Sequence, residues 1–150
     1  MPVHIINKQS AVKVSVRRLR RLLEEVLAGE LGREARVNVL LTDDEKIAEL
    51  NRQFLGKKGP TDVLAWELNE EAEGDDEALF GEVAVSGETA AKQGRRHGNT
   101  PEEELTLYAV HGVLHLAGYD DLTKAKRSRM WKRQREIMKD YRMGVRKRNR

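Results

Sequence analysis

The chain has 150 residues, a length that fits one domain and allows a hydrophobic core without disulfide support. It contains no cysteine, which excludes a disulfide framework and thiolate metal ligands, so any metal site must use His, Asp or Glu. The net charge of +3 is unevenly distributed, with acidic residues crowded in 67–77 and basic residues from Lys124 onward. The basic segment suits nucleic acid, although a solvated helix with a frayed basic tail accounts for it equally well.

The first third of the chain predicts alternating strands and helices. Residues 2–8 have the branched apolar side chains of a short strand, and residues 15–29 have apolar side chains at helical spacing, with Gly29 placed to end the helix. Residues 35–42 predict a second strand. Thr42 and Glu45 then form a capping-box pattern that predicts the start of another helix.

That helix is expected to end near Gly56, and the middle of the chain continues the alternation. The sequence predicts a loop at 56–62, a strand at 62–68 and an acidic exposed connection at 69–78. A further strand at 79–87 and a short helix at 87–98 follow. After residue 98, all predicted elements are helices. The order predicts a small mixed four-stranded sheet packed with about five helices.

The next helix has the clearest start in the chain. Thr100 supplies the N-cap, Pro101 occupies the first helical position, and Glu103 closes a capping box. The helix is expected to run to about Ala117, where Gly118 can adopt the left-handed conformation that ends a helix. Its remaining side chains are mostly apolar, so we expect it to be buried.

A last amphipathic helix is predicted from about Thr123, with its basic side chains outward. The side chains expected to face inward are Met130, Trp131, Ile137 and Met138. Trp66 and Trp131 could stack on nucleic-acid bases, but in a chain with so few aromatic residues the core is the expected place for both.

The stretch HGVLHLAGYDD carries the strongest chemical signal. In a helix, His111 and His115 lie one turn apart on the same side, so both imidazoles can reach one point in space. Gly118 lets the chain turn back, and Asp121 can then supply a third ligand. Zinc accepts two histidines and one carboxylate while keeping a fourth position for water, which is the arrangement of a catalytic site.

Three alternatives compete with a hydrolytic zinc site. The two histidines can be core residues that are satisfied by backbone carbonyls. The spacing also resembles that of metzincin proteases, but Gly112 stands where their glutamate base is required, which argues against peptide hydrolysis. Two histidines and a carboxylate can also hold iron for oxygen chemistry, although nothing else in the chain suggests a cosubstrate site.

Three stretches together resemble a known family: HGVLHLAGYDD, LNRQFLGKKGPTDVLAW (50–66) and LFGEVAVSGETA (79–90). They look like the YbeY family of bacterial rRNA maturation factors, which are metal-dependent single-strand endoribonucleases. The similarity runs from about Asn38 to Tyr141. The resemblance implies an α+β fold with the motif on a central helix and one zinc ion per chain held by three motif residues. It also implies a role in 16S rRNA 3′ end processing and ribosome quality control.

The chain departs from the family pattern at four positions. Asp121 stands in place of the third histidine, and Leu55 in place of an arginine thought to serve catalysis. Ala65 and Glu82 replace Ser and Asp. The negative charge of Asp121 should make a bound water less acidic than three imidazoles would.

The loss of the arginine at Leu55 removes a cation that could stabilise charge on a phosphorane-like transition state. Neighbouring cations can stand in for it: Arg52, Lys57 or Lys58. With Leu55 in this position, binding of RNA can outlast catalysis.

We therefore predict one metal-dependent hydrolase domain over residues 1–150, with a basic tail from about residue 142. The predicted zinc ligands, which are also the predicted catalytic set, are His111, His115 and Asp121. Water activated there would attack an RNA phosphodiester beside a groove supplied by Arg52, Lys57, Lys58, Arg95 and Arg96.

The expected partners are single-stranded RNA, rRNA and the small ribosomal subunit. No window of the sequence approaches the length of a membrane span, so we expect a cytoplasmic protein that does not enter membranes. The alternative function is a ribosome-associated RNA-binding factor with a structural metal. An open metal position holding water favours the enzyme, whereas a fourth protein ligand favours the binding factor.

Overall fold

A computed structural model of the chain describes residues 2–32, 35–68 and 79–148, so the predicted acidic connection at 69–78 lies outside the described residues. The described elements, in chain order, are β1 (Val3–Asn7), α1 (Val16–Leu31), β2 (Arg36–Thr42), α2 (Asp44–Leu55), β3 (Val63–Glu67), β4 (Leu79–Ser86), α3 (Gly87–His97), α4 (Pro101–Leu116) and α5 (Lys124–Arg148).

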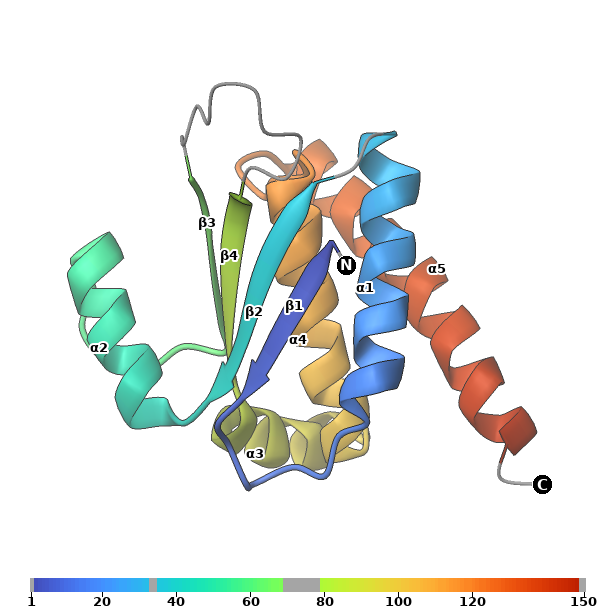
Figure 1. Cartoon of the computed structure of the whole chain (residues 1–150), viewed down its shortest axis with the longest axis horizontal. Helices are drawn as coiled ribbons and strands as arrows, with labels where there is room; N and C mark the ends of the chain where they lie inside the picture. The colour runs from blue at the N-terminus through green and yellow to red at the C-terminus, as the bar shows by residue number, and fades with distance from the viewer. Residues whose placement is uncertain (1, 33–34, 69–78, 149–150) are drawn as a thin grey trace.

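The strands form one mixed sheet in the order β1-β2-β4-β3. The pairs β1–β2 and β2–β4 are parallel, whereas β3 runs antiparallel to β4 and lies at the edge. Figure 1 shows the helices arranged around this sheet, with α3 across one end. The predicted α+β class and the four-stranded mixed sheet with five helices are confirmed over the described ranges.

The two faces of the sheet bear different helices, because side chains alternate along each strand. One face packs against α1 and α4 and forms the main core, to which the strands contribute Val3, Val37, Val39, Leu41, Val83 and Val85. The opposite face packs against α2 through a smaller cluster of Ile47, Leu64 and Ala84. Helices α2 and α4 therefore lie on opposite sides of the sheet.

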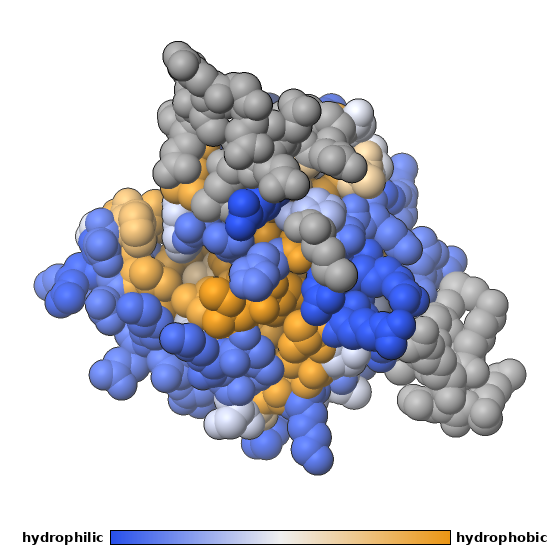
Figure 2. Space-filling model, in the orientation of Figure 1, coloured by the Kyte–Doolittle hydropathy of each residue, from blue (hydrophilic) through white to orange (hydrophobic). Residues whose placement is uncertain are grey.

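The α2 face is only partly covered. Figure 2, which views this face, shows apolar surface between α2 and the β1 side of the sheet. Exposed apolar side chains there include Ile6 of β1 and Phe54 and Leu55 at the end of α2. Phe54 stacks on Trp66 of β3, with ring centroids 4.9 Å apart.

Helix α4 is central and buried, as its apolar sequence predicts. A glycine lets it approach the sheet: a Cβ at Gly112 would lie 2.5 Å from Cγ1 of Val83 on β4. The predicted capping box at Thr100 and Glu103 is present, with Pro101 at the start. Among the described residues, no helix combines the length and apolarity needed to cross a bilayer.

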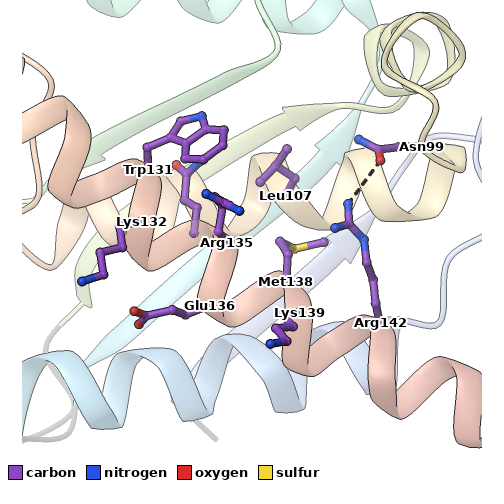
Figure 3. A pocket seen from close by; sticks show the side chains of 10 residues that line it. Asn99, Leu107, Trp131, Lys132, Arg135, Glu136, Met138, Lys139 and Arg142 are labelled. Carbon is purple, nitrogen blue, oxygen red and sulfur yellow. Dashed lines mark hydrogen bonds between the residues drawn. The ribbon is translucent and has the colours of Figure 1, made fainter.

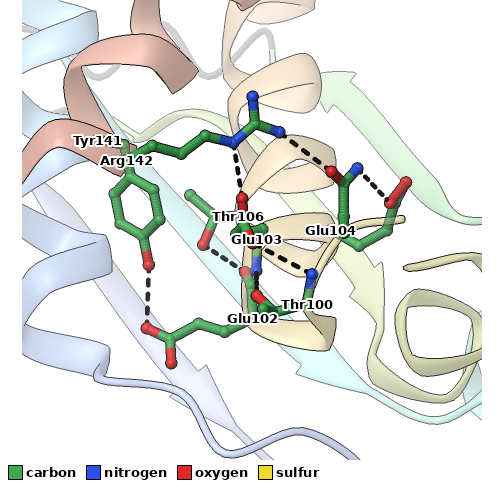
Figure 4. Close-up of polar contacts among 8 residues, drawn as sticks. Thr100, Glu102, Glu103, Glu104, Thr106, Tyr141 and Arg142 are labelled. Carbon is green, nitrogen blue, oxygen red and sulfur yellow. Dashed lines mark hydrogen bonds and ion pairs between the residues drawn. The ribbon is translucent and has the colours of Figure 1, made fainter. Parts of the chain in front are cut away.

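Helix α5 packs across α4 and is tied to its first turn (Figure 4). Tyr141 Oη donates a hydrogen bond to Glu102 at 2.9 Å, and Arg142 Nε donates one to Glu103 at 2.6 Å. These contacts place the length of α5 beside α4.

Two predicted helix boundaries were wrong. Helix α1 continues through Gly29 to Leu31, because Gly32 rather than Gly29 adopts the left-handed conformation, with φ of 62°. Helix α2 is capped by Asp43, whose side chain accepts from Lys46 N at 2.8 Å. The predicted cap Thr42 is instead the last residue of strand β2.

The prediction that Trp131 faces inward was also wrong. Its side chain is 59% exposed, whereas Met130, Ile137 and Met138 are buried as expected. Helix α5 contacts α4 along one side only, so Trp131 faces solvent although Met138, two turns further along nearly the same side of α5, is buried.

Helix α5 continues to Arg148, through the part of the chain predicted to be a tail from about residue 142.

Candidate metal centre

Helix α4 brings His111 and His115 together on one side, as the spacing predicts. Their Nε2 atoms lie 3.2 Å apart, and the two rings meet edge to face at 76°. Both side chains are half-buried, between the core and solvent. They therefore do not belong to the fully buried core, which was the simplest alternative to a metal site.

His111 is held from its other side by α5. Its Nδ1 forms a short hydrogen bond with Oε1 of Gln134. An amide oxygen can only accept, so Nδ1 of His111 donates this hydrogen bond, and the other ring nitrogen, Nε2, faces His115. A hydrogen bond of this kind to the second ring nitrogen is the usual support of a metal-binding histidine.

His115 is kept neutral by its surroundings. Burial lowers the pKa of His115 below its usual range, and the neighbouring His111 lowers it further. The charges of Asp121 and Asp120 and a hydrogen bond with the Tyr119 backbone oppose this shift without reversing it. Neutral imidazole is the form that binds a metal ion.

The chemistry of this pair fits a zinc ion. Two Zn–N bonds of about 2.0–2.1 Å at a tetrahedral angle place their nitrogens about 3.3 Å apart. The observed Nε2–Nε2 separation of 3.2 Å is close to that value. The two histidines thus already stand at the spacing of two ligands of one ion.

The turn after α4 is built as the sequence predicts. Gly118 adopts a positive φ of 105°, and Tyr119 N donates to the Leu114 carbonyl at 3.0 Å. The side chain of Tyr119 then anchors the turn to α1, because its hydroxyl donates to Glu30 at 2.9 Å. Arg133 of α5 binds the same carboxylate at 2.5 Å.

The two aspartates after this turn differ in their contacts. Asp120 accepts from the Leu122 backbone at 3.0 Å and pairs with Lys126 at 3.3 Å. The first of these contacts is the main reason why the pKa of Asp120 lies below its usual range. Asp121 is exposed, and its backbone carbonyl accepts from Arg127 at 3.2 Å.

Over residues 2–32, 35–68 and 79–148, no group of three His, Asp or Glu side chains is arranged to hold a metal ion. The structure thus brings His111 and His115 together and leaves Asp121 outside that cluster. Asp121 nevertheless acts electrostatically on His115. Its role as the third ligand stays a prediction.

Comparison with known proteins gives a decisive match at this point. The sequence profile of the family described as "Endoribonuclease YbeY" matches residues 4–142. The chain belongs to the YbeY family.

Individual YbeY proteins match over most of the chain. "Endoribonuclease YbeY" of Pelotomaculum thermopropionicum is 38% identical over 145 residues, which cover 92% of this chain and 95% of that protein. The protein of the same name from Thermotoga maritima is 38% identical over 81% of this chain and 77% of its own. The solution structure of TM1509 from Thermotoga maritima superposes with a TM-score of 0.69 at 31% identity, covering 97% of this chain and 93% of that one.

The YbeY match begins well before Asn38, where the resemblance in the sequence was expected to begin. It therefore includes β1 and α1, which pack against the same core as α4. The family relation covers the whole described sheet, and not only the motif and the strands next to it.

The five basic residues predicted to bind RNA are all exposed, but they belong to two separate places. Arg52 lies in the last turn of α2, with Lys57 and Lys58 in the loop that follows. Arg95 and Arg96 lie in the last turn of α3. Since α2 packs on the sheet face opposite α4, the structure does not place Arg52 on the α4 side. The contact of all five residues with RNA stays a prediction.

Two cavities do border the region of the YbeY motif, and none of those five residues lines either one. One, of about 280 Å³, lies at the turn after α4, and its lining includes Asp120, Lys126 and Arg129. The other, of about 580 Å³, lies between α4 and α5 and includes Gln134 (Figure 3).

Sequence reasoning missed Gln134, Lys126 and Arg129. Gln134 is a neutral polar residue on a helix whose outer side is strongly basic, and it lies one turn from buried Met130 and Met138. This spacing from two buried residues could have predicted that the Gln134 side chain is directed toward α4. Lys126 and Arg129 carried no such signal, because they are two bases among many in α5.

Proposed function

We propose that the protein is a zinc-dependent endoribonuclease specific for single-stranded RNA, acting in rRNA maturation, including 16S rRNA 3′ end processing, and in ribosome quality control. Its partners would be rRNA and the small ribosomal subunit, in the cytoplasm. Membership of the YbeY family supports the reaction class. The observation that carries the metal dependence is the His111–His115 pair, with Nε2 atoms 3.2 Å apart.

The residues that would hold one zinc ion per chain are His111, His115 and Asp121. Such an ion, when bound, lowers the pKa of a water molecule toward neutrality and acts as a Lewis acid on a phosphoryl oxygen. The protein's own contribution is to present the two imidazoles in a fixed orientation. Gln134 fixes the proton of His111 on Nδ1, and burial favours the neutral form of His115.

The cation that replaces the family arginine at Leu55 is proposed to come from α5. Leu55 is 53% exposed on α2, which packs on the other face of the sheet. Lys126 and Arg129 instead line the cavity at the turn that carries the candidate third ligand. Lys126 is paired with Asp120, so Arg129 is the better candidate to stabilise negative charge on a phosphate in this cavity.

Metal analysis combined with RNA cleavage tests this function. The purified protein is expected to contain about one zinc per chain and to cleave a single-stranded RNA but not a duplex of the same sequence. A chelator should abolish cleavage, and added zinc should restore it. A protein that retains zinc and binds RNA but does not cleave it would support the alternative of an RNA-binding factor with a structural metal.

The role of Arg129 is tested in the same assay. Arg129→Gln is expected to lower the cleavage rate by about 100-fold with unchanged zinc content, which is the usual cost of losing one charge-stabilising donor. Lys124→Gln, which removes a cation from the same end of α5 outside the cavity, is the matched control. Equal rates for the two variants would assign the charge stabilisation to another residue.

A further inference from the structure

The groove between α4 and α5 has features that the metal chemistry does not use. It encloses about 580 Å³, within the range of about 300–1,000 Å³ that is typical of small-ligand sites. Side chains of α5 form most of its lining, and Leu107 of α4 and Asn99 complete it (Figure 3). The α5 stripe follows the helical repeat along one side of the helix: Trp131, Gln134, Arg135, Met138 and Arg142.

The α4 wall leads directly to the histidine pair. Leu107 lines the groove, and His111 lies one turn further along the same side of α4. Gln134, which lines the opposite wall, accepts the hydrogen bond from His111. One end of the groove is therefore in contact with the candidate metal centre.

Trp131 is the unusual member of the groove. Its side chain is 59% exposed, although burial of a tryptophan is favourable. The guanidinium carbon of Arg135 lies 4.8 Å from the centre of the indole ring. Arg135 thus covers one face of the ring, and a planar group can stack from the side that Arg135 leaves open.

The charge of the groove favours an anion. Its lining contains four cationic side chains and one anionic side chain: Lys132, Arg135, Lys139, Arg142 and Glu136. Glu136 pairs with Arg133 at 3.2 Å, and Arg142 pairs with Glu103 at 2.6 Å. Lys132, Arg135 and Lys139 are exposed and line the groove as cations.

We propose that this groove is a nucleotide subsite for the RNA strand next to the cleaved bond, with one base stacked on Trp131 and the backbone phosphates against Arg135 and the neighbouring lysines. The inference rests on the proposed endoribonuclease function and names the surface that selects its substrate. A base in a duplex has both faces covered by its neighbours, so stacking on Trp131 requires an unpaired strand. The groove therefore supplies a physical reason for single-strand specificity.

Binding of a non-cleavable RNA separates this inference from catalysis. The probe is a 2′-O-methyl oligonucleotide of about six nucleotides, followed by fluorescence anisotropy. Trp131→Ala should weaken its binding at least about fivefold, whereas Trp131→Phe, which keeps an aromatic face, should retain most of the affinity. Ile6→Ala, on the other face of the sheet, is the positional control and should stay within about twofold of the wild type.

The salt dependence distinguishes stacking from charge. Trp131→Ala should leave the slope of log affinity against log salt unchanged, whereas Arg135→Gln should reduce it by about 0.7, the value for one phosphate contact with a single strand. Trp131→Ala should not weaken binding of a duplex probe. Equal losses on single-stranded and duplex probes, or no loss on either, would overturn the stacking subsite.

A spectroscopic measurement covers the case in which Trp131→Ala does not fold. Trp66→Phe keeps an aromatic partner for Phe54 and leaves Trp131 as the only tryptophan. Saturation with the probe should then quench the emission of Trp131, and unchanged emission would contradict the proposal.

If the wild type binds the probe and its tryptophan emission is quenched, but it cleaves no RNA, the proposed enzymatic function fails while the nucleotide subsite stands. If it cleaves RNA and Trp131→Ala binds normally, the groove fails alone.

Discussion

His111 is oriented by Gln134, a residue 23 positions further along the chain. The motif supplies the two imidazoles, but α5 decides which nitrogen of His111 carries the proton. Hydrogen bonds of this kind commonly raise the affinity of a metal site by one or two orders of magnitude. A residue outside the motif is therefore expected to share control of the candidate metal centre.

Gln134→Ala is predicted to weaken zinc binding about 10- to 100-fold, since the His111 ring loses the acceptor that holds it. Gln134→Glu should preserve or strengthen binding, because a carboxylate accepts the same hydrogen bond. Competition with a chromogenic zinc chelator measures both affinities. Unchanged affinity of Gln134→Ala would show that α4 orients His111 without help from α5.

The two aspartates after the turn are predicted to have separate roles. Asp121→Ala should lose zinc and Asp121→His should retain it, because imidazole serves equally well as the third ligand. Asp120→Ala should bind zinc nearly normally, because Asp120 braces the turn through Leu122 and Lys126. Zinc content after dialysis checks all three variants. A metal-free Asp120→Ala beside a loaded Asp121→Ala would assign the ligand to Asp120.

Glu103 links stability to pH at the start of α4. Burial by itself raises the pKa of Glu103, but hydrogen bonds from Arg142 and Thr100 outweigh it, so the pKa lies below its usual range. A lowered carboxyl pKa contributes stability above the unfolded-state pKa, and this stability is lost as pH falls through the folded-state pKa. Glu103→Gln should thus cost about 0.5 kcal/mol at neutral pH, after allowance for solvent screening, and almost nothing below about pH 3. Urea unfolding at both pH values measures the difference, and a cost independent of pH would exclude a contribution from the charge.

At the scale of the elements, the position of α4 depends on how closely it approaches β4. Gly112 leaves no room for a side chain, since its Cβ would lie 2.5 Å from Val83. Gly29 of α1 has no neighbouring atom within 4 Å of the same position. Replacement of glycine by alanine therefore tests overpacking at Gly112 and helix propensity at Gly29.

Gly112→Ala is predicted to destabilise the fold by about 1–3 kcal/mol through overpacking, although alanine is the better helix former. Gly29→Ala is predicted to stabilise it by about 0.5–1 kcal/mol, because only the helix propensity changes. Denaturant unfolding gives both free energies. A stable Gly112→Ala variant would mean that α4 can move away from β4 without loss of packing.

Considered as a whole, the molecule combines a modest net charge of +3 with a basic helix whose bases are partly paired. Arg133 pairs with Glu30 and Arg142 with Glu103, so those two cations serve the packing of α5. The described bases of α5 that face solvent, such as Lys132 and Lys139, are the ones proposed to contact RNA. A single-stranded RNA is expected to meet this side of the molecule first.

RNA affinity is accordingly predicted to depend steeply on salt, because phosphate contacts release counterions. Anisotropy titrations with single-stranded RNA from about 50 to 200 mM salt should show a loss of at least tenfold, which corresponds to a few phosphate contacts. Affinity that does not change over this range would contradict an interface dominated by bases.

Features that depend on neighbours in the chain followed from the sequence by itself. The cap at Thr100, the positive φ at Gly118 and the meeting of His111 with His115 each arise within about one or two helical turns. Local sterics and hydrogen bonds decide such features, so residue type and spacing are sufficient. The alternation of strands and helices likewise predicted the mixed sheet, because hydrophobic periodicity is a local property.

Only the tertiary structure decided which distant surfaces meet. The exposure of Trp131 and the contact of Gln134 with His111 depend on the side from which α5 packs on α4. The placement of Arg52 away from the α4 side depends on the sheet face that α2 covers. Each of these arrangements is set by the sum of many long-range packing contacts, and no short stretch of sequence carries that sum.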